Sequence, residues 1–530
     1  MSTMTAEQAK VDVTVTQKEW LAIIGGLIGG FMAILDIQIT NSSMKVIQGA
    51  LSASLDESSW LMTSYFTAEI VAIPLCGWLA KALGTGRYAL CCITGFLVSS
   101  ILCSWSWNLD SMIVFRAIQG FAGGALIPLS FRLIIEILPR EKRAIGMSMF
   151  SVIATFAPAI GPALGGWLTN HFSWQAIFYV NAIPSVLAFT LIYQSIQHPK
   201  VNWKIIRQGD FVGVISVMLF LGALEVILEK GREESWFDSN MICILSIVSF
   251  ISFIVFIYDQ IVSINPLVNI RLFKEFQYSY ALIIFAMLGV AIYGTLFLVP
   301  YYLTMVHDYN ATEIGHVVIW MGLPQLLVLP LIPFLVRIYN PKYLICIGFI
   351  GLSISAFMNC HMDLHYSGPQ MVLSMMIRAV GQPFIMVPLS MLATQNIKAE
   401  DAMSSAVLIN VFRSIGGSMG TAILTTYFSA QVYVHFDGVK SVILKGSQVL
   451  YHYFSDVKHL LITQGIASSQ TDVQKVAIGL MGKRIIKQAE IMAFNNLFFI
   501  MGVMMFGTAM MVLFSNREFQ IYLKKEMKND

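Results

Sequence analysis

Fourteen stretches of mostly apolar residues recur along this chain, and they constrain its fold more than any other feature. A helix that crosses the hydrocarbon core of a bilayer needs about 20 such residues. The stretches lie approximately at 20–40, 60–80, 88–107, 109–137, 145–168, 175–194, 210–229, 240–258, 277–303, 313–337, 343–361, 369–395, 403–430 and 490–514. The sequence therefore predicts an all-α polytopic membrane protein with fourteen transmembrane helices.

The composition agrees with a chain that faces lipid. Hydrophobic residues make up 57% of the chain and charged residues only 12%, against about 25% charged residues in a typical soluble domain. The net charge of +3 is too small to indicate a nucleic-acid partner. The seven cysteines lie in or beside apolar runs without metal-ligand spacing, so we expect neither a metal site nor a cofactor.

Basic residues in the short loops predict the orientation, because cytoplasmic loops are enriched in Lys and Arg. With the N-terminus in the cytoplasm, every short loop on that side carries at least one of them: Lys81, Arg87, Arg140, Lys142, Arg143, Lys200, Lys204, Arg207, Arg271, Lys274, Arg337, Lys342 and Lys398. An even number of helices returns the C-terminus to the same side. We therefore expect both termini to be cytoplasmic, and we see no cleavable signal peptide in the polar residues 1–19.

The order of the apolar stretches suggests two halves and an insertion. Residues 20–194 form a predicted six-helix bundle, and residues 277–514 form a second one that includes a long polar loop at 431–489. The predicted helix pair at 210–258 is inserted between them. Residues 1–19 and 515–530 are expected as cytoplasmic tails. Two such bundles are typical of transporters whose halves rock around a central cavity.

Three motifs resemble the signatures of the major facilitator superfamily. One is the loop after the second helix, with Gly77, Gly84 and Arg87, although Lys81 stands where the family usually has an acid. The second is the Arg-x-x-Gln-Gly pattern of helix four, and the third is the antiporter signature of helix five. The latter two contain Arg116, Gln119, Gly120, Pro158, Gly161, Pro162, Gly165 and Gly166.

Two further stretches resemble the EmrB/QacA group of fourteen-helix drug:proton antiporters, and EmrB-type pumps above all. They are 35–41, with Asp36, and 228–237, after helix seven. The resemblance implies a bacterial inner-membrane pump that exchanges a hydrophobic or amphipathic compound outward for protons inward. It also implies a periplasmic adaptor protein and an outer-membrane channel as partners, which the loop 431–489 would face. The alternative for that loop is a solvated segment without a partner.

Ionisable residues inside membrane helices are the candidate functional residues, because burying them is costly. Asp36, Glu69 and Arg116 are our candidates for proton coupling; the alternative for Asp36 is a static partner of a nearby hydroxyl or arginine. A carboxylate in an apolar site can hold a proton near neutral pH and release it when hydrated. The candidates for the cavity and the substrate are Asn41, Glu225, Arg378 and Arg413, with packing as the alternative for Glu225.

Other functions remain to be weighed. The same machinery could export one dedicated metabolite, such as a siderophore, or work as a proton-coupled importer, although the motif at 158–166 argues against import. The chain has no Gly-x-x-x-x-Gly-Lys nucleotide motif and no His-Glu-x-x-His protease motif. We therefore expect a transporter driven by the proton gradient, and no enzyme.

Overall fold

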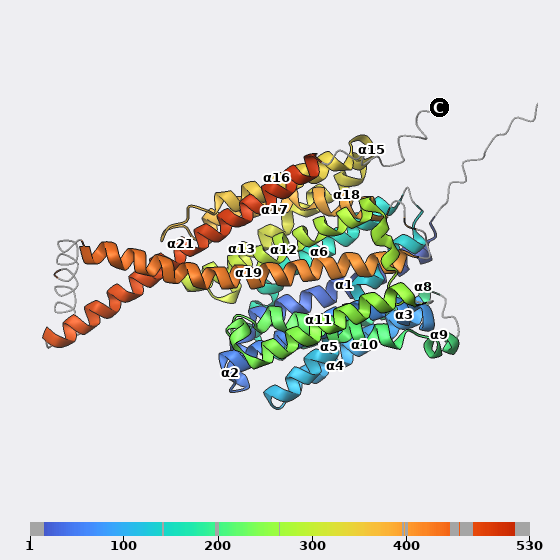
Figure 1. Ribbon diagram of the computed structural model, residues 1–530, viewed down its shortest axis with the longest axis horizontal. Coiled ribbons are helices and arrows are strands. Elements are labelled where there is room, and N and C mark those ends of the chain that lie inside the picture. Colours follow the sequence, from blue (N-terminus) through green and yellow to red (C-terminus); the bar gives the residue numbers. More distant parts are fainter. Residues whose placement is uncertain are drawn as a thin grey trace, which may run out of the picture.

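The structure is a computed structural model, and it describes residues 15–139, 142–196, 201–263, 266–394, 397, 401–445, 455 and 470–514. The expected tail 515–530 and most of the expected tail 1–19 lie outside this part of the chain, as does the middle of 431–489. The described part is almost entirely helical (Figure 1), and fourteen of its helical segments are long and apolar enough to cross a membrane. Each of the fourteen predicted spans coincides with one of them.

The first six spans form the N-terminal bundle. They are α1 (Gln17–Ser42), α3 (Leu55–Leu83), α4 (Thr85–Ser104), α5 (Leu109–Ile137), α6 (Arg143–His171) and the consecutive pieces α7 (Ala176–Tyr179) and α8 (Ala182–Ser195). The short helices α2 (Met44–Ala50) and α9 (Trp203–Arg207) lie in the connections. Gly84, at the junction of α3 and α4, has φ 84°, a conformation that favours glycine.

The other eight spans comprise the inserted pair and the C-terminal bundle. The pair is α10 (Phe211–Lys230) and α11 (Asn240–Val262), joined through η2 (Trp236–Asp238), and η3 (Ile270–Lys274) follows it. The bundle begins with α12 (Phe276–His307). Its second span is built from α13 (Ala311–Val318), η4 (Ile319–Met321), α14 (Leu323–Val328), η5 (Leu329–Leu331) and α15 (Ile332–Ile338), and it continues with α16 (Pro341–Met358), α17 (Gly368–Gly381), α18 (Pro383–Thr394), α19 (Ala402–Lys445) and α21 (Gln470–Phe514).

The inserted pair packs against the bundles mainly along one of its two helices. Helix α10 contacts α3 of the first bundle, α19 of the second, and its own partner α11. Helix α11 exposes a row of large apolar side chains, among them Ile244, Ile247, Phe250 and Ile254. A bilayer is the solvent for such a surface, so α11 faces lipid. Helix α10 buries one side against the bundles and exposes another, with Val212, Ile215 and Leu219 among its exposed residues.

The segment 431–489 differs from the loop that the sequence predicts. Helix α19 continues to Lys445 and α21 already begins at Gln470, so both described ends of the segment are helical. These extensions cross and project well beyond the bundles, at the end of the molecule where α2 lies (Figure 1). The first residues of α1 and the last residues of α21 lie toward the opposite end of the molecule. Polarity excludes a segment from the bilayer but does not prevent it from forming helix.

Candidate transport site

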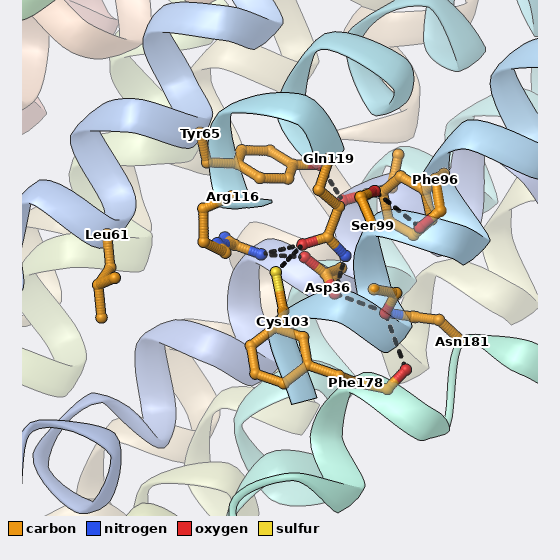
Figure 2. A network of polar contacts seen from close by, with 12 residues as sticks. Asp36, Leu61, Tyr65, Phe96, Ser99, Cys103, Arg116, Gln119, Phe178 and Asn181 are labelled. Atoms are coloured by element: carbon orange, nitrogen blue, oxygen red, sulfur yellow. Dashed lines mark hydrogen bonds and ion pairs between the residues drawn. The ribbon is translucent and has the colours of Figure 1, made fainter. Parts of the chain in front are cut away.

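Asp36 lies in the middle of a buried polar network inside the N-terminal bundle (Figure 2). Its Oδ2 is 2.5 Å from Nη1 of Arg116, with which it forms an ion pair. Its Oδ1 accepts hydrogen bonds from Nε2 of Gln119 at 3.0 Å and from Nδ2 of Asn181 at 2.6 Å. Asp36 is 1% exposed and Arg116 0%. Three donors from two other spans therefore converge on one carboxylate that water does not reach.

Arg116 is held in place from two further sides. Its Nη1 also donates to Oε1 of Gln119 at 2.8 Å, and its guanidinium carbon lies 4.3 Å above the centre of the Tyr65 ring. A cation that contacts an aromatic face gains electrostatic attraction, more so when it is desolvated. The negative charge of Asp36 offsets the free-energy cost of burying the guanidinium. Removing either charge therefore leaves the other one buried without a counter-charge.

Asn181 is the member of the network that the sequence analysis missed. It lies between α7 and α8, and its Nδ2 also donates to Oγ of Ser100 on α4 at 3.0 Å. The hydroxyl of Ser100 in turn donates to the carbonyl oxygen of Phe178 at 2.8 Å. The backbone of Asn181 stays in the helical region (φ −67°, ψ −17°), and the one asparagine in the apolar run 175–194 was the available signal in the sequence.

A cavity of about 310 Å³ lies outside this network, between the two bundles and α10. Asn41 and Glu69 line it from the first bundle, and Glu225 lines it from the inserted pair. Oε1 of Glu225 accepts a hydrogen bond of 2.7 Å from Ser418 on α19, whereas its Oε2 has no partner among the described residues. The other lining residues are Ile37, Gln38, Met62, Phe66, Ile70, Leu228, Glu229, Arg232, Glu233, Tyr293, Leu296, Phe297, Ser414, Gly417, Ser418, Thr421, Ala422 and Thr425.

The two remaining candidates lie elsewhere. Arg413 lines a small adjoining cavity together with Glu69, and its Nη2 donates to Oδ1 of Asn410 at 3.0 Å. Arg378, which the sequence analysis assigned to the central cavity, is not among the described residues that line it. It faces a separate small cavity inside the C-terminal bundle, between α12, α16, α17 and α21. Charge and depth alone did not tell which side of the helix Arg378 occupies.

Lys230 closes the end of α10 against the first bundle. It is 2% exposed, and its ammonium group contacts Oγ of Ser59, the carbonyl oxygen of Asp56 at 3.0 Å and the carboxylate of Glu233 at 2.6 Å. The same nitrogen lies 5.0 Å from the centre of the Trp60 ring. Since Glu233 also lines the central cavity, this cluster ties the inserted pair to α3 beside the cavity.

The motif glycines are points of close helix contact. A Cβ at Gly120 would collide with the backbone of Tyr65, and one at Gly161 with Cβ of Gln38. A Cβ at Gly165 would lie 2.8 Å from the carbonyl oxygen of Ile39. A Cβ at Gly166, one residue further, would instead meet the start of α13 in the second bundle. Helix α6 therefore packs against α1 on the side of Gly161 and Gly165, and against the second bundle on the side of Gly166.

The other motif residues lie in α3, α4, α5 and α6. Pro158 and Pro162 are buried within α6, and Gly77 is buried within α3. Arg87 lies in the first turn of α4, next to the junction at Gly84. Gln119, which the sequence analysis grouped with the conformational motifs, donates directly to Asp36. Its amide is therefore part of the charged network itself.

Two helix bundles around a central cavity, with a buried ion pair beside it, define a membrane transporter. The chain belongs to the Major Facilitator Superfamily, whose family model matches residues 26–421. It is 30% identical over 498 residues to the colistin resistance protein EmrB of Acinetobacter baumannii, covering 94% of this chain and 96% of that protein. It is 28% identical over 474 residues to the multidrug export protein EmrB of Escherichia coli K12, covering 88% and 90%.

The solved structures agree on the fold. The proton:xylose symporter XylE superposes with a TM-score of 0.58 and covers 98% of this chain and 100% of its own, at 13% sequence identity. At that identity the likeness shows the architecture alone. The predicted family, the all-α fold and the resemblance to EmrB-type proteins are thereby confirmed.

Proposed function

We propose that this protein exports hydrophobic or amphipathic compounds across the bacterial inner membrane in exchange for protons. One observation carries the proposal: α1 bears Asp36 on one side, and its next residues Ile37, Gln38 and Asn41 line the central cavity. A change in the charge of Asp36 and a compound in the cavity would therefore act on the same helix.

The network gives a physical route from a proton to a movement. Arg116 stays charged at any physiological pH, so the proton that is exchanged belongs to a carboxylate. When Asp36 takes up a proton, the ion pair with Arg116 loses its attraction and one oxygen becomes a donor. The contacts of α1 with α5 then weaken. Release of the proton to water on the other side restores them.

The lining of the cavity supports the proposed substrate class. Its volume is at the lower end of ligand sites in proteins, which measure roughly 300–1,000 Å³. Met62, Phe66 and Phe297 supply an adaptable apolar wall, and Glu69 of α3 and Glu225 of α10 supply acidic groups. The relatives named for multidrug export and colistin resistance support a broad range of compounds rather than one.

The projecting ends of α19 and α21 are the proposed contact for further components. If both termini are cytoplasmic, as the basic loops predict, these extensions lie in the periplasm. They expose Tyr433, Val434 and Ile478, which suits a periplasmic adaptor that leads to an outer-membrane channel. Export at full rate by this protein alone, in cells that lack any adaptor, would contradict this part of the proposal.

The test is substrate-induced proton movement in reconstituted vesicles. A panel of hydrophobic cations and weak-acid uncouplers is added to wild-type protein and to Asp36→Asn. We expect protons to move opposite to at least one compound in the wild type and this coupled movement to be lost in the variant. Proton movement in the same direction as the compound would indicate an importer. No movement with the whole panel would favour export of one dedicated metabolite, such as a siderophore.

A further inference from the structure

The fourth span of each bundle carries a similar short sequence pattern, although the proline follows the arginine by twelve residues in α5 (128 − 116 = 12) and by ten in α17–α18 (388 − 378 = 10). Helix α5 reads Arg116-Ala-Ile-Gln-Gly and later Ile127-Pro-Leu-Ser, and the α17–α18 pair reads Arg378-Ala-Val-Gly-Gln and later Val387-Pro-Leu-Ser. This internal repeat identifies Arg378 as the counterpart of Arg116. Both arginines are buried. The surroundings of Arg378 can therefore be compared with those of Arg116.

The counterpart of Asp36 is not an acid. Asp36 stands nineteen residues after Gln17, the first residue of α1, and Thr295 stands nineteen residues after Phe276, the first residue of α12 (36 − 17 = 295 − 276). Thr295 lines the same small cavity as Arg378, and its hydroxyl donates to the carbonyl oxygen of Ala291 at 2.8 Å. The second bundle thus repeats the cation of the first without its anion.

The guanidinium of Arg378 has free donors at this cavity. Its Nε and Nη2 have no hydrogen-bond partner among the described residues, and it forms no ion pair with any of them. The side chain is 3% exposed. A buried charge is costly unless it is paired, and inside a membrane-spanning bundle water offers little compensation. The N–H groups of a guanidinium form a planar fork that suits an anion.

The cavity limits the size of what could pair with it. Its volume is about 10 Å³, which is room for about one atom of the size of a water oxygen. Thr295, Ser355 and Asn359 contribute polar atoms, and Leu352, Phe498 and Met501 are among the apolar residues that close it. An organic substrate does not fit. A halide ion, which is larger than a water oxygen, fits once the flexible side chains of Met501 and Met505 in the lining move outward.

We propose that the C-terminal bundle binds one monoatomic anion, chloride, at Arg378. The anion takes the place that the Asp36 carboxylate occupies in the N-terminal bundle. It neutralises the arginine and accepts hydrogen bonds from Nε and Nη2. This site does not depend on the proposed exchange of protons, because it is separate from the central cavity and from the network around Asp36.

The experiment uses the full-length protein in detergent, in buffers of equal ionic strength that contain gluconate, chloride or bromide. The measured quantity is the midpoint of thermal unfolding, because a ligand that binds only the folded state raises it in proportion to the logarithm of its concentration beyond Kd. We expect chloride and bromide to raise the midpoint of the wild type relative to gluconate. Arg378→Gln should lose this dependence, and Arg132→Gln, an arginine paired with Glu136 near the surface, should keep it.

A second variant tests the same proposal if Arg378→Gln fails to fold. Thr295→Asp places a carboxylate where the first bundle has one, so it should fold and lose the halide dependence without added anion. Diffraction from bromide-soaked crystals should show an anomalous peak beside Arg378 in the wild type only. A wild-type midpoint that is the same in all three buffers would mean that water satisfies the guanidinium, and would overturn the proposal. So would a halide effect that survives in both variants.

Discussion

The ion pair between Asp36 and Arg116 allows a prediction in which restoring stability does not restore function. In Asp36→Asn, one of the two oxygens that accept from Arg116, Gln119 and Asn181 becomes an amide nitrogen that faces a donor. Arg116, which is 0% exposed, is left without its counter-charge. Breaking a buried pair from one side costs about 3–5 kcal/mol, so the free energy of unfolding should fall by that amount. Arg116→Gln should cost a similar amount, because it strands the carboxylate.

The double variant removes both charges and should regain much of the loss. Replacing both members of a buried pair is often close to neutral. We therefore expect a coupling energy between the two sites of at least about 2 kcal/mol, within the range for residues in direct contact. The assay is unfolding in mixed micelles, followed by tryptophan fluorescence, for wild type, both single variants and the double variant.

Export is measured on the same four proteins. The double variant should be as stable as, or nearly as stable as, the wild type and yet show no proton-linked export, because no carboxylate remains in the network. Two results would refute this reasoning. Strictly additive losses of stability would mean that the pair contributes no interaction, and full export by the double variant would mean that coupling takes place elsewhere.

Three other variants test neighbouring contacts. Asn181→Ala removes one donor to Asp36 and should lower the free energy of unfolding by about 1–3 kcal/mol, with slower export; an unchanged protein would remove Asn181 from the network. Gly165→Ala should impair export because its Cβ would press on the backbone of α1. The control Gly507→Ala, whose Cβ meets open space, should export like the wild type. Equal export by both variants would mean that Gly165 has no role in transport. Lys230→Gln should loosen the contact of α10 with α3. A cysteine placed at Thr421 in the cavity should then react faster with a water-soluble maleimide. Unchanged labelling would contradict this.

Much of the fold was predictable because the bilayer sets the length and polarity of every span. All fourteen spans were located in this way, and Asp36 and Arg116 were singled out because charges inside a membrane are rare. Their direct contact was not predictable from spacing, since it depends on how α1 packs against α5. The same limit explains why Arg378 was assigned to the central cavity. The sequence shows its depth in the membrane, but it does not show that Arg378 faces the interior of its own bundle.

Uncharged polar residues escaped notice for a different reason. Serines and asparagines are common in membrane helices and usually bond to the backbone of their own helix, as Ser148 does with Ala144. Asn181 looks the same in the sequence, and only the structure brings it to Asp36. Gln119 was noted as part of a motif, but the motif does not say that its amide lies 3.0 Å from a carboxylate oxygen. Long-range partners of neutral side chains are set by packing, which the periodicity of one helix does not contain.

Helix α1 is the element where these observations meet. Asp36 turns into the N-terminal bundle, Gln38 lines the cavity, and Gln38 and Ile39 meet the glycines of α6. Helix α6 in turn touches the second bundle through Gly166. A side chain added at Gly161 or Gly165 would push α6 away from α1, whereas one added at Gly166 would push it from the other bundle. If α1 transmits the protonation of Asp36 to the cavity, substitutions at Gly161 should uncouple proton movement from export. Those at Gly166 should slow both together.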